Sequence, residues 1–161
     1  MKLSGKKKTE DDNAGVVLKP PIVYFLPLGA GLLLNYAFPL PFFPLVLSLV
    51  LGIGLVAKGL FVSGWALRTF RREGTSEKTN KPTTMIIVTG PFRFTRNPIY
   101  GGFIAIYFGV TFLANALWPV FLFPIVMIVM HYGVIKREER YLEGKFGKEY
   151  LEYKAKVRRW V

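Results

Sequence analysis

A short basic stretch, residues 89–102, contains the residue types best suited to binding a charged ligand. Arg96 offers a planar guanidinium that pairs through two hydrogen bonds with a carboxylate or a phosphate. Asn97 and Pro98 predict a helix start directly after it, because Asn is a favoured N-cap whose side chain accepts from a backbone N–H, and Pro suits the first helical position. A helix N-terminus beside an arginine favours an anionic group.

Tyr100, Gly101 and Gly102 follow in the first turns of that predicted helix. The two glycines remove side chains, so that a ligand or another backbone can approach closely. A second interpretation stays open, because an arginine at the end of a membrane helix often meets only lipid phosphates and paired glycines often only permit tight helix packing.

Two adjacent carboxylates, Glu138 and Glu139, follow the last apolar run, and His131 precedes them by nearly two helical turns on the same predicted face. A pair of carboxylates and an arginine buried at that depth need each other or a charged ligand. The alternatives are a solvated helix end for the glutamates and a hydrogen-bonded structural role for the histidine. The chain has no cysteine, which excludes thiolate chemistry, and we expect no metal site.

The elements that position these residues are membrane helices. The chain of 161 residues is 52% hydrophobic yet carries a net charge of +12, and its charges and apolar residues occupy separate segments. No Asp, Glu, Lys or Arg occurs in residues 20–57 or 97–135. Because one bilayer crossing needs about 20 apolar residues, each run is long enough for two helices.

Prolines and turn residues divide each run in two, at residues 38–44 and at residues 115–119. The fold class predicted is therefore an all-α integral membrane protein with four transmembrane helices, arranged as two hairpins, at about residues 22–38, 45–67, 98–113 and 119–135. Lys58 is the one charge within a predicted span. It is a functional candidate, or it extends its ammonium group to the membrane surface.

The two ends of the chain are polar. Residues 1–19 predict a disordered cytoplasmic tail rather than a signal peptide, and residues 20–161 the membrane domain. Within it, residues 136–161 predict an amphipathic interfacial helix that closes over the bundle, weakened by two glycines. Its apolar positions recur at helical spacing: Leu142, Phe146, Tyr150, Tyr153 and Val157.

Lysine and arginine gather in the tail, in the central loop 68–96 and in the C-terminal segment, and the two hairpin turns contain none. The positive-inside rule then places both termini in the cytoplasm. We expect membrane lipids as partners and no nucleic acid, because the N-terminal lysines lie beside three acidic residues and suit an anionic lipid surface. The sequence does not indicate an oligomeric state.

Both ends of the second hairpin lie on that cytoplasmic side. Arg96, Asn97 and Tyr100 at its start are therefore expected to face Glu138 and Glu139 at its end. The resulting site would lie partly in lipid and be closed by the C-terminal segment.

These residues together resemble the isoprenylcysteine carboxyl methyltransferase and phospholipid methyltransferase superfamily, whose pattern is Arg-(His/Asn)-Pro-x-Tyr-x-Gly, an apolar stretch and Glu-Glu. The resemblance covers about residues 60–161. Its elements here are Gly90-Pro91, Arg96-Asn97-Pro98, Tyr100, Gly102, Glu138-Glu139, Phe146-Gly147-Lys148-Glu149-Tyr150 with Tyr153, and Val157-Arg158-Arg159-Trp160.

The resemblance implies methyl transfer from S-adenosylmethionine to a lipophilic small molecule or lipid that enters from the bilayer. It implies that the cofactor pocket is lined by Gly90, Pro91, Asn97, Tyr100, Gly102 and Glu139. Arg96 and Glu138 would orient the substrate as the catalytic pair. Asn97 stands where isoprenylcysteine enzymes have His, which favours the phospholipid-like members.

Two other functions remain compatible with the sequence. A sterol-reductase-like membrane enzyme has a similar C-terminal hairpin but uses a nicotinamide cofactor, and it is expected to have more spans. A non-enzymatic four-span protein would carry Arg96, Glu138 and Glu139 only as interface charges. Cofactor preference separates the two enzymes, whereas in a non-enzymatic protein replacing these three residues would change no ligand binding or activity.

Overall fold

The computed structural model describes residues 14–74 and 83–160, and every regular element in these ranges is helical. The all-α prediction is therefore confirmed for them. Most of the predicted tail, part of the central loop and Val161 lie outside the described residues. The elements are α1 (Pro20–Ala37), α2 (Leu45–Arg72), a 3₁₀ helix η1 (Gly90–Arg93), α3 (Pro98–Leu113), α4 (Trp118–Val129), a π-helix η2 (Met130–Ile135), α5 (Lys136–Phe146) and α6 (Lys148–Lys156).

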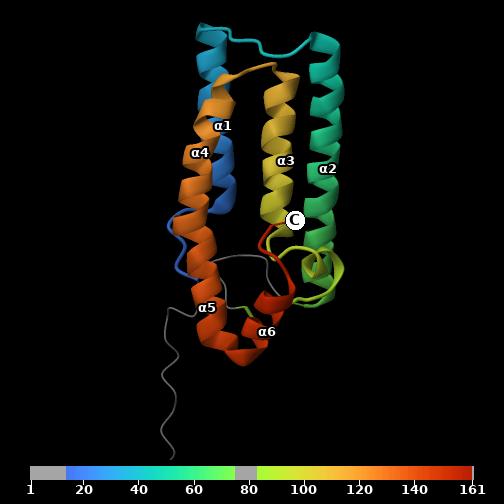
Figure 1. Cartoon of the computed structure of the whole chain (residues 1–161), viewed down its shortest axis with the longest axis vertical. Coiled ribbons are helices and arrows are strands. Elements are labelled where there is room, and N and C mark those ends of the chain that lie inside the picture. The colour runs from blue at the N-terminus through green and yellow to red at the C-terminus, as the bar shows by residue number, and fades with distance from the viewer. Residues whose placement is uncertain (1–13, 75–82, 161) are drawn as a thin grey trace, which may run out of the picture.

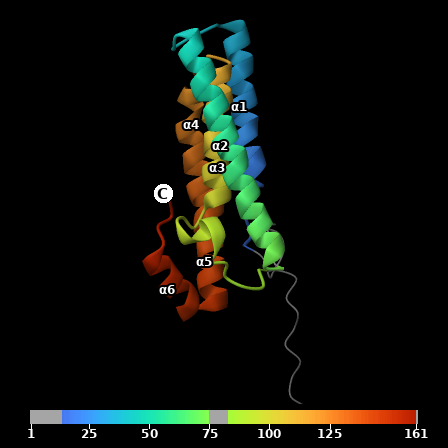
Figure 2. The same ribbon diagram turned by 90° about the vertical axis from the view of Figure 1, so that its right-hand side faces the viewer.

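The four long helices of the described chain run side by side, with both hairpin connections at one end (Figure 1). α2 packs along α3, and α1 packs against α4 and α3. The other end holds η1, α5, α6 and the N-terminal segment (Figures 1 and 2). Buried tyrosines and aliphatic residues of α1, α3, α4 and η2 form the main core between them.

Three helices of the described residues are long and apolar enough to cross a membrane: Pro20–Ala37, Leu45–Arg72 and the continuous helix Trp118–Phe146. α3 has 16 residues and is shorter than those three. At about 1.5 Å per residue it spans about 24 Å, somewhat less than the roughly 30 Å hydrocarbon layer. Its bounds nevertheless coincide with the predicted third span.

Small residues bring α2 and α3 into close backbone contact. A Cβ atom on Gly59 would lie 2.6 Å from the carbonyl oxygen of Gly102, and one on Gly102 would lie 2.1 Å from Ser63 Oγ. The two helices are equally close near the hairpin turns, where a Cβ atom on Gly52 would lie 2.8 Å from the backbone nitrogen of Leu113. Close approach of this kind is how membrane helices associate without a hydrophobic driving force.

One side chain ties the two hairpin turns together. The amide oxygen of Asn115 accepts hydrogen bonds from the backbone N–H groups of Phe42 and Phe43, and its Nδ2 donates to the carbonyl oxygen of Phe43. Trp118 Nε1 donates to the carbonyl oxygen of Phe38 across the same gap. These contacts fix the two hairpins relative to each other.

The C-terminal segment differs in part from the predicted interfacial helix. α5 continues α4 and η2 as one rod instead of turning across the bundle, and α6 turns back beside it (Figure 2). The break comes at Gly147, whose φ of +54° is a left-handed conformation that suits glycine. α6 thereby reaches the loop that precedes α3, since Tyr153 Oη donates to the carbonyl oxygen of Phe92 at 2.7 Å.

Residues 14–19, expected to belong to the disordered tail, lie against the fourth helix. The Val17 N–H donates to the carbonyl oxygen of Gly133 at 3.1 Å, and Arg137 Nη1 donates to that of Gly15 at 2.9 Å. Val16 packs against the main core. The segment thus continues the polar end of the bundle on the side of α4.

Candidate functional site

A cavity of about 920 Å³ opens at the polar end of the bundle. Its walls come from residues 14–22, the end of α2, residues 83–87 and the helices α5 and α6. Five residues predicted for the site line it together: Arg96, Asn97, Tyr100, Glu138 and Glu139. The expected convergence of the two ends of the second hairpin is therefore present in the structure.

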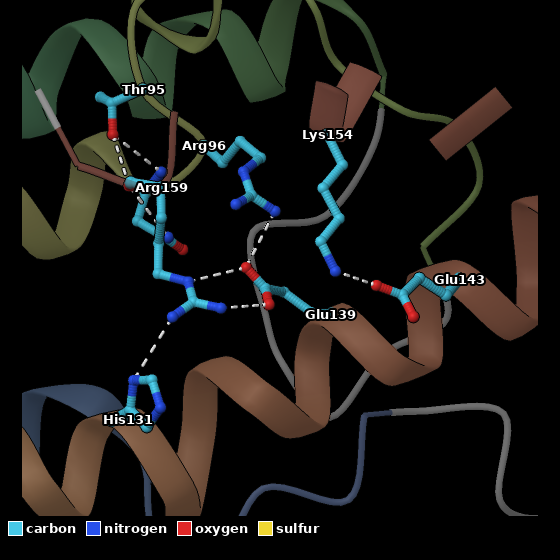
Figure 3. A network of polar contacts seen from close by, with 8 residues as sticks. Thr95, Arg96, His131, Glu139, Glu143, Lys154 and Arg159 are labelled. Carbon is cyan, nitrogen blue, oxygen red and sulfur yellow. Dashed lines mark hydrogen bonds and ion pairs between the residues drawn. The ribbon is translucent and has the colours of Figure 1, made fainter. Parts of the chain in front are cut away.

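Glu139 is the centre of the polar network (Figure 3). The side chain of Arg159 donates to both of its carboxylate oxygens, at 3.0 Å from Nε and 2.7 Å from Nη2. Arg96 Nη1 lies 2.9 Å from Glu139 Oε1. Two guanidinium groups therefore hold one buried carboxylate, and these three groups together carry one net positive charge.

Arg96 has donor capacity left over. Its side chain is only 10% exposed, and its buried Nε has no hydrogen-bond partner among the described residues. Its Nη1 forms the ion pair with Glu139 without the alignment of a hydrogen bond. A buried donor without a partner is costly, so this guanidinium is suited to an additional acceptor from a ligand.

The C-terminal arm, residues 157–160, holds the loop before α3 in place. The Arg96 N–H donates to the carbonyl oxygen of Arg158 at 3.0 Å. Thr95 Oγ1 and Asn97 Nδ2 both donate to the carbonyl oxygen of Arg159, at 2.8 and 3.3 Å. These three hydrogen bonds fix the backbone at residues 95–97 and thereby the position from which the Arg96 side chain extends.

The same contacts correct one local prediction. Asn97 does occupy the N-cap position of α3, and Pro98 begins the helix, but the Asn97 side chain makes no capping hydrogen bond. Its amide group donates to the C-terminal arm instead. The hydrogen bond of the Asn97 side chain to Arg159 thus takes the place of the predicted capping bond within α3.

A second hydrogen-bonded pair, Tyr100 and Glu138, lies beside the network. Tyr100 Oη donates to Glu138 Oε1 at 2.6 Å, a short bond of the kind formed with charged acceptors. Tyr100 comes from the first turn of α3 and Glu138 from the first turn of α5. This bond joins the two ends of the second hairpin directly.

His131 contacts the network from the π-helix. Its Nδ1 lies 3.5 Å from Arg159 Nη1, and this contact rather than one with Glu138 is the one observed (Figure 3). π-Helical turns are rare and occur often at functional sites. Here the turn places a histidine beside the arginine that holds Glu139.

Three residues predicted to line the pocket lie elsewhere. Gly102 packs against Ser63 and Gly59 of α2, as in the alternative that treated the glycines as packing residues. Gly90 lies against Thr69. Pro91 is buried in η1, where its carbonyl oxygen accepts from the N–H of Phe94. These three residues are not among those that line the cavity. They lie in the backbone on either side of Arg96.

Arg159 and Tyr150 are the site residues that sequence reasoning did not assign. Tyr150 is buried in the cavity wall, and this burial raises the pKa of its phenol while the guanidinium of Arg96 acts in the opposite direction. The hydrogen bond to Glu139 raises the pKa of Arg159, so the ion pair stays charged. Both residues lie in the C-terminal motifs on which the resemblance to the superfamily rests. Those motifs could have indicated them as site residues.

Comparisons with known proteins identify the family of the chain. No solved structure matches the chain. Over 37 residues the chain is 57% identical to an uncharacterized protein of Haemophilus influenzae, a match that covers 23% of this chain and 59% of that protein. The family of phospholipid methyltransferases matches residues 47–149, more than half of the chain, and thus includes α3, Arg96, Tyr100 and both glutamates. The chain therefore belongs to the phospholipid methyltransferase family.

Proposed function

We propose that the protein transfers a methyl group from S-adenosylmethionine to a lipophilic acceptor at the cytoplasmic face of its membrane. The observation that carries the proposal is the cluster of Arg96, Glu138 and Glu139 in one cavity at the polar end of an apolar bundle, with Arg159 bound to Glu139. Membership of the phospholipid methyltransferase family supplies the reaction class.

The membrane arrangement proposed has four spans. α3 lies between the longer helices and starts and ends at the same two ends of the bundle (Figure 1). With four spans the N-terminal segment, the central loop and the C-terminus share one side, and their excess of Lys and Arg favours the cytoplasm. The polar continuation of the fourth helix, α5, would stand at the membrane surface on that side.

The residues present fit the cofactor's charged groups. The buried Nε of Arg96, which lacks a partner among the described residues, suits the cofactor's carboxylate. Asn97, Tyr100 and Tyr150 line the same part of the cavity. Glu139 would act by orienting Arg96 and Arg159, because both of its oxygens are already bound. S-adenosylmethionine, when bound, supplies an electrophilic methyl group.

Glu138 and Tyr100 would position the acceptor. Methyl transfer is an in-line displacement, which depends on alignment and exclusion of water more than on a strong acid or base. Glu138, held by Tyr100, presents a carboxylate oxygen to the cavity. It can hold a polar acceptor group and receive the proton that an amine or hydroxyl acceptor loses.

The family match favours methyl transfer over the nicotinamide-dependent reductase and over a non-enzymatic membrane protein. The test is transfer of a radiolabelled methyl group from S-adenosylmethionine into lipids when the purified protein is reconstituted in vesicles of total membrane lipid. Label in the lipid fraction supports the proposal. Arg96→Met should abolish the signal, whereas Arg71→Met, at an exposed position on α2, should not. Equal labelling with and without protein would contradict the proposal.

A further inference from the structure

One wall of the cavity comes from a segment that lies outside the residues matched by the family. The family match begins at residue 47, whereas residues 14–22 line the cavity over nearly their whole length. The polar cluster on the opposite side belongs to the matched region or to the C-terminal arm. The N-terminal wall is therefore one of two parts of the pocket that lie outside the family match, the other being Tyr150 and Tyr153 of α6.

This wall is apolar and belongs to the bundle. It presents Val16, Val17, Leu18 and Ile22, and beyond them Phe103 and Ile135 continue the apolar lining. Val17 and Leu18 remain 58% and 46% exposed although both line the cavity. Such apolar surface next to a polar centre suits a hydrocarbon chain.

The wall also has a defined place. The backbone hydrogen bond from Val17 to Gly133 and the side-chain hydrogen bond from Arg137 to the carbonyl oxygen of Gly15 attach it to the π-helix and to the start of α5. Glu138 lines the same cavity, so the apolar wall and the carboxylate proposed to hold the acceptor group face one shared space.

A cation completes the chemistry. Lys19 lines the cavity as the N-cap residue of α1 and is exposed. In the chain it lies between the apolar wall residues Leu18 and Ile22. At about 920 Å³ the cavity is at the upper end of the range for one small-molecule site, which leaves room for an acceptor beside a cofactor.

Resting on the proposed function, we propose that residues 14–22 bind the acyl chain of a phospholipid acceptor and thereby determine which lipids are methylated. The acyl chain packs against Val17, Leu18 and Ile22, and Lys19 pairs with the phosphate. No covalent step involves this segment. It acts through the affinity for the acceptor alone.

The experiment uses the full chain in phosphatidylcholine vesicles that contain phosphatidylethanolamine with a photoreactive diazirine in its acyl chain. After irradiation, the labelled peptides are mapped by mass spectrometry. Label on residues 14–22 that excess unlabelled phosphatidylethanolamine displaces supports the proposal. Label confined to the outer faces of the helices, or label that is not displaced, overturns it.

A matched pair of variants sharpens the test. Leu18→Asp places a charge on the wall, and we expect it to lower the labelling of residues 14–22 about fivefold to tenfold through lost apolar contact. Val88→Asp makes the same change at an exposed apolar residue, 52% accessible, that does not line the cavity, and it should leave labelling unchanged. Equal effects of the two variants would overturn the proposal.

The placement of the wall has its own check. The chain contains no cysteine, and a Cβ built on Gly133 would lie 3.7 Å from Val17 Cβ, within the range that a disulfide requires. Val17→Cys with Gly133→Cys should therefore form an internal disulfide on oxidation. Its absence in a folded variant would overturn the wall. Binding of S-adenosylmethionine is measured in parallel, so that failure of the wall is distinguished from failure of the proposed function.

Discussion

Arg159, two residues from the C-terminus, binds both oxygens of the Glu139 carboxylate, at 3.0 and 2.7 Å. The carboxylate is 10% exposed, and Arg96 approaches it from the other side at 2.9 Å. The end of the chain is thereby part of the site, and it connects the fourth helix with the loop before α3.

Arg159→Lys should weaken the site although it keeps the charge. Lysine cannot form the two parallel hydrogen bonds that Arg159 donates to Glu139. Glu139, the counter-ion of Arg96, is then held less firmly. We expect about a tenfold loss of affinity for S-adenosylmethionine and a stability loss of about 1–3 kcal/mol. Calorimetry and thermal unfolding in detergent measure the two effects. Arg140→Lys, at an exposed position of α5, is the control, and equal behaviour of both variants would contradict the assignment.

Tyr100→Phe should slow methyl transfer while leaving the helix bundle intact. The change removes only the hydroxyl that donates to Glu138 at 2.6 Å. A hydrogen bond to a charged group is worth about 1.5–3 kcal/mol, so kcat should fall about tenfold to a hundredfold. Tyr132→Phe removes a hydroxyl from a tyrosine that is 61% exposed and should have no effect. An unchanged rate in Tyr100→Phe would remove Tyr100 from the reaction.

Gly102→Ala and Gly101→Ala should behave differently. A Cβ at residue 102 would meet Ser63 Oγ at 2.1 Å, whereas one at residue 101 would meet nothing within 4 Å. We expect Gly102→Ala to destabilise the α2–α3 contact by about 1–3 kcal/mol, and Gly101→Ala to be neutral or slightly stabilising. Thermal unfolding measures both. Full stability of Gly102→Ala together with lost cofactor binding would restore Gly102 to the cofactor pocket.

The proposed membrane orientation can be tested with single cysteines, because the chain has none of its own. Arg71→Cys and Lys148→Cys should react with a membrane-impermeant maleimide from the cytoplasmic side only. Leu40→Cys, in the first hairpin turn, should react from the opposite side only. Labelling of residues 71 and 148 from opposite sides would refute the four-span arrangement.

The sequence predicted the helices well because prolines and charges mark their ends. Pro98 begins α3 and Leu113 ends it, as the pattern of prolines and apolar residues predicted. α2 runs past the predicted end near Leu67 to Arg72, because arginines suit the last turn of a helix and need no lipid around them. The close contact of Gly59 and Gly102 was one of two interpretations of the glycines.

Long-range contacts of irregular segments were not predictable in the same way. The binding of Glu139 by Arg159 depends on the turn at Gly147, which returns α6 and the C-terminal arm to the loop before α3. The attachment of residues 14–19 depends on a backbone contact with Gly133 inside a π-helix. Glycine signals a possible break at residue 147, but no residue type specifies the direction in which the chain returns or the partner that it meets. Helical periodicity gives the faces of a helix but not the partners of such segments.

The most direct test of the central claim is calorimetric titration of the detergent-purified protein with S-adenosylmethionine, with NADPH titrated in parallel. The account predicts binding of S-adenosylmethionine with a dissociation constant of about micromolar size, which corresponds to about −8 kcal/mol, and no binding of NADPH. Arg96→Met should remove the signal. Binding of NADPH alone, or binding of S-adenosylmethionine unchanged in Arg96→Met, would contradict the assignment of the site.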